Sequence, residues 1–302
     1  MTLPGFFCMG FNEMKKHLTS SFLLFLSGLL FYGLLIMPFT TYMRNKPIEE
    51  KLGYVPSIKL LKPLSADQKE LVGASLVMKV LMYFGGAVGK AQEGRMITEP
   101  VDLQGMSRLL HGAVRLDPYN MDAYYFAQGF LTWDARQFKV ANDLLDYGMG
   151  YRTWDWQLPF FAGFNHAFFL KDYARAAGYY QRAGELSGSS LHINLAGRYM
   201  QEAGQTDLAI VYLAAMEKGE RNPAMKKSYQ IRLLAFQEVR RIERARDRFK
   251  SEQNILPISV EQLQQAGFLQ PAPVDPYGGR FYLEPTGKVA TTSKFAFAGV
   301  KK

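Results

Sequence analysis

The feature that most constrains this fold is a pattern of small and large residues that returns about every 34 positions. Each copy starts with a residue that is alanine in three of four cases, and these residues, separated by 35, 35 and 33 positions, are Met106, Ala141, Ala176 and Ala209. Four positions later stand the large residues Leu110, Leu145, Tyr180 and Leu213, and three further on stand Ala113, Gly148, Ala183 and Met216. Steps of four and three share one helical face. The pattern therefore predicts a series of helices that each pack closely against a neighbour.

A second set of positions marks another helix in each copy. Twelve residues before each starting residue, glycine occurs in three of four cases, at the positions Gly94, Gly129, Phe164 and Gly197. Proline, which stops helices, follows Asp117 and Asn222 near the ends of copies. Over residues 87–222 this period resembles the tetratricopeptide repeat (TPR), in which each unit is a pair of antiparallel helices. The alternative is a non-repeating helical bundle, which is not expected to keep this spacing over three intervals.

The N-terminal region contains a long apolar run. No charged residue occurs between Leu18 and Met43, and Ser20–Phe39 alone supplies twenty residues, enough to cross a bilayer core of about 30 Å. The run is long for a cleaved signal peptide, the alternative, and no small-x-small cleavage site follows it. We predict a tail at 1–19 and an uncleaved transmembrane anchor at 20–43. Basic residues flank both ends, and we expect a single-pass protein of the bacterial inner membrane with most of the chain in the periplasm.

The remaining boundaries follow from helix breakers and composition. Gly53-Tyr54-Val55-Pro56 and Lys62-Pro63 predict a linker at 44–64. Helical repeats are expected at 65–223, with a first helix that begins at Ser65 and stops at Gly85-Gly86. A basic capping helix is expected at 224–253 and a separate tail at 254–302. The predicted fold is thus mainly α: a TPR-like helical-repeat solenoid after one transmembrane helix, with a small C-terminal helix and β-hairpin.

The predicted helix at 224–253 is rich in arginine, in a chain with net charge +9. Its arginines lie opposite an apolar stripe and include Arg232, Arg240, Arg241, Arg244, Arg246 and Arg248. A basic face formed by Arg240, Arg241, Arg244 and Arg248 is one possible site for anionic lipid, nucleic acid or an acidic partner. The alternative, which we favour, is a solvated face on a helix that caps the repeats. Nucleic acid is an unexpected partner for an exported domain.

The tail after Pro257 has its own pattern. Ser259 has the form of a helix cap, the short helix should end at Gly267, and two β-prone runs flank Pro285-Thr286-Gly287, which predicts a β-hairpin. This tail resembles the C-terminal module of type II secretion major pseudopilins at Pro257, Leu263, Gly267, Phe268, Pro273, Asp275, Pro276, Tyr277, Gly278 and Tyr282. The chain lacks that family's prepilin cleavage motif, and 290–294 lacks acidic residues for calcium. We therefore expect neither pilin processing nor calcium, and a hairpin that docks on the basic helix.

The sequence shows no catalytic array. Its four histidines are scattered, its one cysteine is Cys8, and it has no H-E-x-x-H, G-x-S-x-G or P-loop motif. Gly85–Lys90 is glycine-rich but lacks the P-loop order, and we interpret it as a turn between helices. We predict a protein that is not an enzyme, with no cofactor, no metal site and no catalytic residues.

The TPR resemblance implies a binding groove lined by the first helix of each unit. The residues that it places in this groove are Arg95, Phe126, Phe130, Phe161, Asn165, Asn194 and Arg198, with Trp133 at the edge. Asparagine and arginine at these positions resemble the family's clamps for peptide carboxylates, which need charge-assisted donors. We predict a scaffold or adaptor that binds protein or peptide partners in an envelope assembly such as a pilus, secretion or surface-assembly system. The alternatives are a basic-helix module for anionic lipid or nucleic acid, and an accessory subunit of an envelope enzyme.

Overall fold

The computed structural model describes residues 7–92 and 101–295, which form two compact units. Unit 1 contains residues up to Pro56 together with Met78–Leu109, and unit 2 contains Ser57–Val77 and the chain from Leu110 onward. Helices α4 (Lys69–Gln92) and α5 (Leu103–Leu116) contribute to both.

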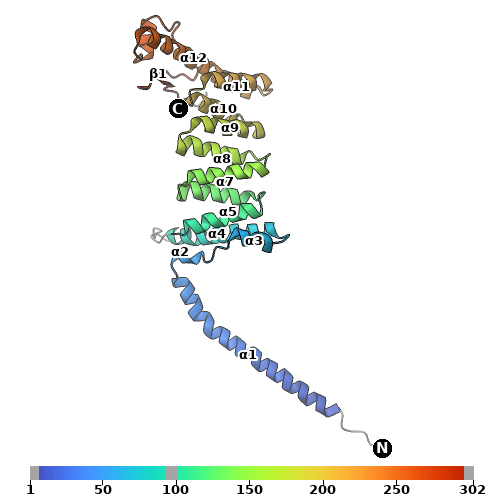
Figure 1. Cartoon of the computed structure of the whole chain (residues 1–302). Helices are drawn as coiled ribbons and strands as arrows, with labels where there is room; N and C mark the ends of the chain where they lie inside the picture. The colour runs from blue at the N-terminus through green and yellow to red at the C-terminus, as the bar shows by residue number, and fades with distance from the viewer. Residues whose placement is uncertain (1–6, 93–100, 296–302) are drawn as a thin grey trace, which may run out of the picture. The chain divides into compact units, whose positions relative to one another are not determined.

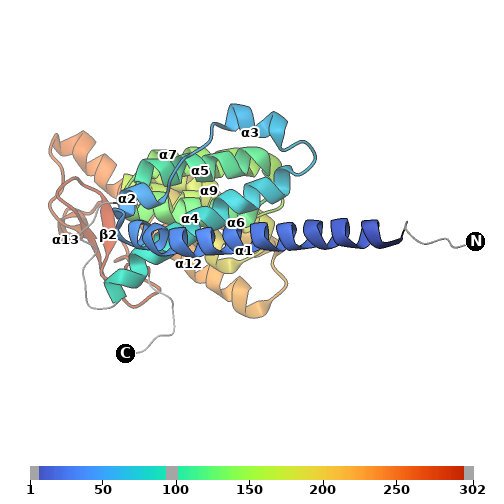
Figure 2. The same ribbon diagram turned by 90° about the horizontal axis from the view of Figure 1, so that it is seen from below.

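Unit 1 begins with the helix α1 (Phe7–Asn45), one continuous helix in two views (Figures 1 and 2). Its segment Ser21–Asn45 has a mean hydropathy of 2.2, and none of its most apolar window is buried in the protein. The short helix α2 (Ile48–Lys51) follows. Leu52 is buried, and the Tyr83 hydroxyl accepts a hydrogen bond of 2.8 Å from the Asp102 amide. The predicted apolar helix is therefore present, while its place in a membrane stays a prediction.

The segment predicted as a linker contains α2 and a further helix, α3 (Ile58–Leu64). Ser65 ends α3 and does not start α4. Its amide donates to the Leu61 carbonyl at 2.8 Å, and its hydroxyl donates to the Lys62 carbonyl. The helix α4 also continues through Gly85-Gly86, so the predicted stop there is wrong. Glycine inside a helix costs only about 1 kcal/mol, which buried neighbours such as Tyr83 and Ala87 offset.

Unit 2 contains a stack of consecutive helices joined by short loops, each packed on the next (Figure 1). After the end of α5 these are α6 (Met121–Gly129), η1 (Phe130–Asp134), α7 (Phe138–Tyr151), α8 (Gln157–Asn165), η2 (His166–Leu170), α9 (Tyr173–Ser187), α10 (Ser190–Glu202) and α11 (Thr206–Gly219). Short connections make successive helices antiparallel. The first helices of the units are α6, α8 and α10, and the second helices are α5, α7, α9 and α11.

The repeated small–large–small residues are the packing positions of the second helices. All four starting residues and all four large residues are at most 2% exposed. Ala113 and Ala183 are also fully buried, and only Met216, which departs from the small-residue pattern, is half-buried. The predicted TPR-like helical repeat is confirmed by these helix pairs.

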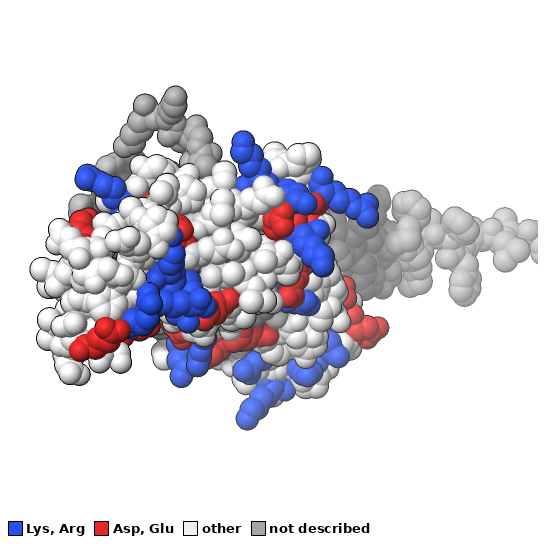
Figure 3. Space-filling view, turned by 90° about the horizontal axis from the view of Figure 1, so that it is seen from above, with Lys and Arg blue, Asp and Glu red and all other residues white. Residues whose placement is uncertain are grey.

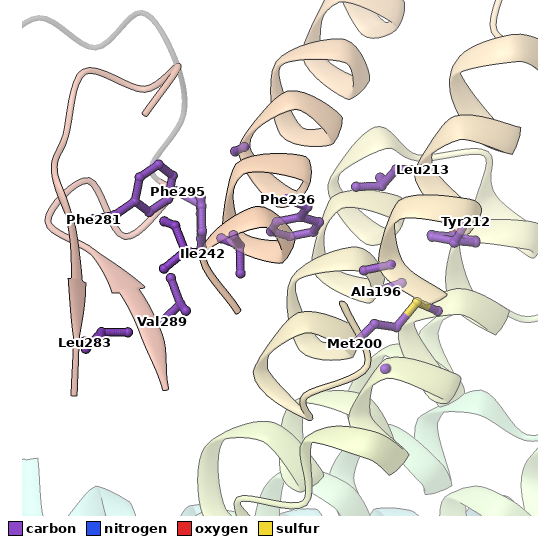
Figure 4. Close-up of a cluster of buried hydrophobic side chains, with 14 of the residues drawn as sticks. Ala196, Met200, Tyr212, Leu213, Phe236, Ile242, Phe281, Leu283, Val289 and Phe295 are labelled. Carbon is purple, nitrogen blue, oxygen red and sulfur yellow. The ribbon is translucent and has the colours of Figure 1, made fainter. Parts of the chain in front are cut away.

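The repeats end on the long helix α12 (Pro223–Gln253), which Asn222 caps by accepting from the Ala224 and Met225 amides. Beyond it, Ser259 caps α13 (Val260–Gln265), and β1 (Phe281–Leu283) pairs with β2 (Val289–Thr291) in an antiparallel hairpin. In Figure 4 the hairpin residues Phe281 and Val289 lie beside Ile242 of α12, and α12 separates them from α10 and α11. The hairpin therefore docks on α12, as expected.

Candidate functional site

Equivalent positions on the first helices place the predicted groove residues on one face, which we call the first-helix face. The helix α12 continues this series, since Ser228 follows Asn194 by 34 positions and Arg232 follows Arg198 by the same interval. The first-helix face thus comprises Phe126, Phe130, Trp133, Phe161, Asn165, Phe168, Asn194, Arg198, Ser228 and Arg232. Arg95 lies outside the described residues.

The helices α6 and α8 end alike, in the five-residue π-helices η1 and η2. A wide backbone hydrogen bond of 3.0 Å closes the last turn of each. The Ala135 amide donates to the Phe130 carbonyl five positions earlier, and the Asp172 amide donates to the His166 carbonyl six positions earlier. A residue with positive φ then redirects the chain, Arg136 in one unit and Lys171 in the next. Such wide turns occur often at functional sites.

Each of these wide turns presents an aromatic ring to solvent. Trp133 is 58% exposed and Phe168, 35 positions later, is 54% exposed. The Trp133 ring centroid lies 5.1 Å from that of Phe169, and Phe168 stacks on Phe164 at 5.4 Å. We call Trp133, Phe164, Phe168 and Phe169 the aromatic ridge. Phe126 and Phe161 are half-buried and both contact the exposed Tyr125.

Two predicted groove residues lie in the interior instead. Phe130 is only 6% exposed, and Asn165 is fully buried. The Asn165 side chain donates to Asn142 Oδ1 at 2.9 Å and accepts from Thr132 Oγ1 at 3.4 Å. Both polar atoms of Asn165 are therefore used between neighbouring helices, and the assignment of Asn165 as a ligand-facing residue is wrong.

At the other end of the first-helix face, α10 and α12 meet the C-terminal module. Asn194 donates to Ser228 Oγ at 3.4 Å, which ties the two helices together. Arg232 is 5% exposed, and its guanidinium lies over the ring of Tyr277 at 5.2 Å. We call Asn194, Arg198, Ser228, Arg232 and Tyr277 the arginine cluster.

Several polar atoms of the arginine cluster are buried without a hydrogen-bond partner: Asn194 Oδ1, Arg198 Nε, Arg232 Nε and Arg232 Nη1. Burial lowers the pKa of the Arg232 guanidinium, and the positive charge of Arg198 lowers this pKa further. The Tyr277 side chain hydrogen bonds to Arg232 and acts in the opposite direction. The sequence pattern placed Arg232 among the arginines opposite the apolar stripe of α12, although the 34-residue interval from Arg198 could have revealed its buried position.

The four arginines of the predicted basic face are engaged within the chain. Arg240 forms a bidentate pair with Asp207 of α11, with both N–O distances 2.7 Å, and Arg244 is 3.9 Å from the same carboxylate. Arg241 and Arg248 donate to backbone carbonyls in the C-terminal segment, at Pro271 (2.8 Å) and Phe268 (2.9 Å). Figure 3 shows basic and acidic side chains interspersed on the face seen from above. These contacts match the interpretation of α12 as a capping helix.

Two of the three histidines of unit 2, His166 and His192, have the surroundings of packing residues. His166 and His192 are both buried, and burial lowers the pKa of each imidazole. His192 lies against the rings of Trp156 and Phe160, with centroids 5.0 and 5.1 Å away. Within residues 7–92 and 101–295 no group of three His, Cys, Asp or Glu side chains could hold a metal ion.

No family model matches the chain, and no curated protein matches its sequence. Among solved structures, it is similar to the crystal structure of YrrB, described as a TPR protein with an unusual peptide-binding site. The match covers 70% of this chain and 89% of that chain, with 15% sequence identity and a TM-score of 0.35. The repeat in this chain is recognised from its own helix pairs, and the similarity to this structure is not used as evidence for it.

Proposed function

We propose that this protein is a membrane-anchored scaffold whose first-helix face binds protein partners. The observation that carries the proposal is the aromatic ridge, in which Trp133 and Phe168 are both more than half exposed at equivalent positions of successive units. Clustered exposed aromatic rings are typical of interaction surfaces, because they bury a large apolar area with little loss of conformational freedom. A stack of repeats supplies a long rigid surface for such a partner.

The anchor and the setting are part of this proposal. The helix α1 exposes an apolar segment of 25 residues, Ser21–Asn45, whose one charged residue is Arg44 at its C-terminal end, and such a segment is suited to a bilayer. We propose one membrane pass by α1 in the bacterial inner membrane, with most of the chain that follows α1 on the periplasmic side. The resemblance of the C-terminal tail to pseudopilin modules supports a pilus, secretion or surface-assembly system as the setting.

Site-specific photo-crosslinking in native membranes tests the scaffold. A photoreactive aromatic residue at position 168 of the full chain should capture one protein partner, identified by mass spectrometry, and the same residue at position 133 should capture the same partner. The control position is Arg175, whose side chain is 72% exposed on the second helix α9. The proposal predicts little capture from position 175, and a fall of at least about tenfold at position 168 when Trp133→Ser is added, since losing a buried aromatic anchor costs about 2 kcal/mol or more.

Two outcomes would contradict the proposal. One is equal capture from position 175, because that would mean contact without preference for the first-helix face. The other is unchanged capture in the Trp133→Ser chain, because the ring would then contribute nothing to binding. Thermal unfolding of each variant is measured alongside, so that loss of the fold is separated from loss of the partner.

A further inference from the structure

The short helix α3 is rich in apolar residues, and none of them is buried. Four of its seven residues are isoleucine or leucine. At 3.6 residues per turn they share one arc of about 160° around the helix, and they are Ile58, Leu60, Leu61 and Leu64. The rest of the circumference carries Lys59, Lys62 and Pro63. A helix with separate apolar and basic faces is suited to the surface of a membrane.

The rest of the chain covers only one edge of this apolar arc. Ile58 forms that edge and is half-buried, and a Cβ at Gly112 of α5 would lie 3.9 Å from the Ile58 Cδ1 atom. At the opposite edge Leu60 is 58% exposed and Leu64 is 79% exposed. These two leucines lie one turn apart on the same face of the helix. Single exposed leucines are ordinary on a protein surface, but this pair forms an apolar face that a further surface can cover.

The other face of α3 is basic. Lys59 and Lys62 are both exposed, and within the described part of the chain neither side chain has an ion-pair partner. Lysine is depleted in protein–protein interfaces. At a bilayer surface, in contrast, lysine extends its charge to the lipid phosphates while its apolar stem lies along the acyl boundary. The composition of α3 therefore fits an anionic bilayer better than a second copy of the chain or another protein.

The chain connection limits the distance between α3 and the end of α1. Twelve residues, 46–57, separate the two helices, and even when fully extended they span only about 40 Å. If α1 crosses a bilayer, α3 is therefore tethered within reach of its surface. A helix as short as α3 binds lipid weakly by itself, but a tether makes the contact intramolecular and raises its occupancy.

We infer that α3 binds the surface of an anionic lipid bilayer, with Leu60 and Leu64 at the acyl boundary and Lys59 and Lys62 at the lipid phosphates. This inference rests on the membrane pass that we proposed for α1, and it adds a second contact with the same membrane. Because Ile58 joins α3 to α5 within unit 2, the contact restrains unit 2 relative to the bilayer.

Quenching of a fluorophore by labelled lipids tests this contact in the full chain. The chain carries Cys8→Ser, so that one new cysteine, Leu60→Cys or Leu64→Cys, takes the label. It is reconstituted in nanodiscs of phosphatidylcholine and phosphatidylglycerol in equal amounts. A nitroxide near the lipid headgroup should quench both labels more than a nitroxide at the acyl-chain end, because an interfacial helix lies about 5–10 Å into the boundary of headgroups and acyl chains. The control is Leu234→Cys, a leucine of α12 that is 54% exposed, which neither nitroxide should quench.

A charge variant tests whether the bound lipid is anionic. It is measured at the phosphatidylglycerol content at which wild-type quenching is half-maximal. Lys59→Gln with Lys62→Gln should lower the ratio of bound to free α3 about 25-fold, since each lysine near an anionic surface contributes about fivefold. The matched control, Lys218→Gln with Lys250→Gln, removes the same charge from exposed positions of α11 and α12 and should leave the quenching unchanged.

An apolar variant tests the other face of α3. With the label at position 60, Leu64→Ser should lower the ratio of bound to free α3 at least about tenfold, because a leucine side chain leaves the acyl boundary. Leu64 is exposed, so this variant should unfold at the wild-type temperature in detergent. An unchanged ratio in the folded variant would mean that the leucine pair does not enter the bilayer, and the inference would be wrong.

Other outcomes would also overturn the inference. Labels at positions 60 and 64 that neither nitroxide quenches would mean that α3 does not contact lipid, and energy transfer between those labels on different copies would identify a second copy as the occupant. Quenching that persists undiminished in phosphatidylcholine alone would exclude recognition of anionic lipid.

A label on α1 separates this inference from the membrane pass on which it rests. Leu30 is 68% exposed near the middle of the apolar segment, and Leu30→Cys should be quenched most by the nitroxide at the acyl-chain end. Quenching at position 30 without quenching at position 64 would leave the membrane pass intact and refute the contact of α3. The reverse result would refute the pass and leave the surface contact.

Discussion

The first and second helices of the repeat units differ in which positions keep the same kind of residue from one unit to the next. On the second helices, Ala141, Ala176 and Ala209 occupy the same buried position in successive units. On the first helices, one position changes from Phe161 to Asn194 within one interval. In a stacked repeat each unit contacts only its neighbours. The buried face of the second helices, which we call the packing side, must therefore preserve the size and shape of its side chains, while the first-helix face can vary. The packing side therefore carries stability, and the first-helix face is the one on which we propose that a partner binds.

The largest expected effect comes from adding volume to the packing side at Gly148. A Cβ at this position would lie 2.7 Å from Tyr124 Cε1 and 3.0 Å from Leu158 Cδ1, and both side chains are fully buried. Because neither can move into solvent, Gly148→Val should lower the free energy of unfolding by about 3 kcal/mol. Urea unfolding of the full chain in detergent, followed by circular dichroism, measures the change.

The control is Gly150→Val, two residues away on the same helix α7. A Cβ at Gly150 has nothing within 4 Å. Valine and glycine differ by less than about 0.5 kcal/mol in helix propensity, so this variant should unfold near the wild-type midpoint. Equal destabilisation by the two substitutions would mean that the glycine of the small–large–small pattern is not a site of close helix approach.

The packing side could be predicted from sequence because a period reports which residues share a helical face. Which residues of the first-helix face are buried could not be predicted in this way, because burial depends on the side chains of the neighbouring helices. Asn165 has the spacing of a groove residue, but Asn142 and Thr132 form hydrogen bonds with it in the interior, whereas Phe161 is half-buried and Phe168 is exposed. The sequence of Ser65–Gln68 likewise fits a helix N-cap, yet the Ser65 hydroxyl donates a hydrogen bond to the Lys62 carbonyl of the preceding helix α3.

The arginine cluster could not be predicted for a different reason. The predicted repeats end at residue 223, so the interval of 34 residues from Arg198 to Arg232 extends past them into α12. The amphipathic pattern of α12 then placed Arg232 with Arg240 on a solvated face. Which arginine meets an oxygen depends on Asp207 and on the docked C-terminal segment, and these contacts are distant in sequence.

A smaller effect is expected at Asn165, which lies at a first-helix position but belongs to the packing side. Asn165→Leu leaves Asn142 Oδ1 and Thr132 Oγ1 buried without partners, so the free energy of unfolding should fall by about 2 kcal/mol. Adding Asn142→Leu should recover part of this loss, because apolar side chains on both sides remove most of the unpaired polar atoms. Capture of a partner at position 168 should be unchanged in the folded variant. Additive losses in the double variant would show that the amide pair contributes no coupling.

The smallest expected effect is the pH dependence due to His192, a first-helix residue buried against Trp156 and Phe160. Burial lowers the pKa of His192 in the folded chain, whereas the unfolded chain titrates near pH 6.5. The unfolded state therefore binds the proton more readily, and the stability that the neutral imidazole contributes is present above about pH 6.5 and is lost as the pH falls through the folded pKa. His192→Asn should flatten the decline of the unfolding temperature between pH 7 and pH 5 relative to wild type, while His166, whose pKa is also lowered by burial, keeps a remaining decline. A decline that is the same in both proteins would mean that His192 binds protons equally in the folded and the unfolded state, and its burial would then have no consequence for the acid stability of the packing side.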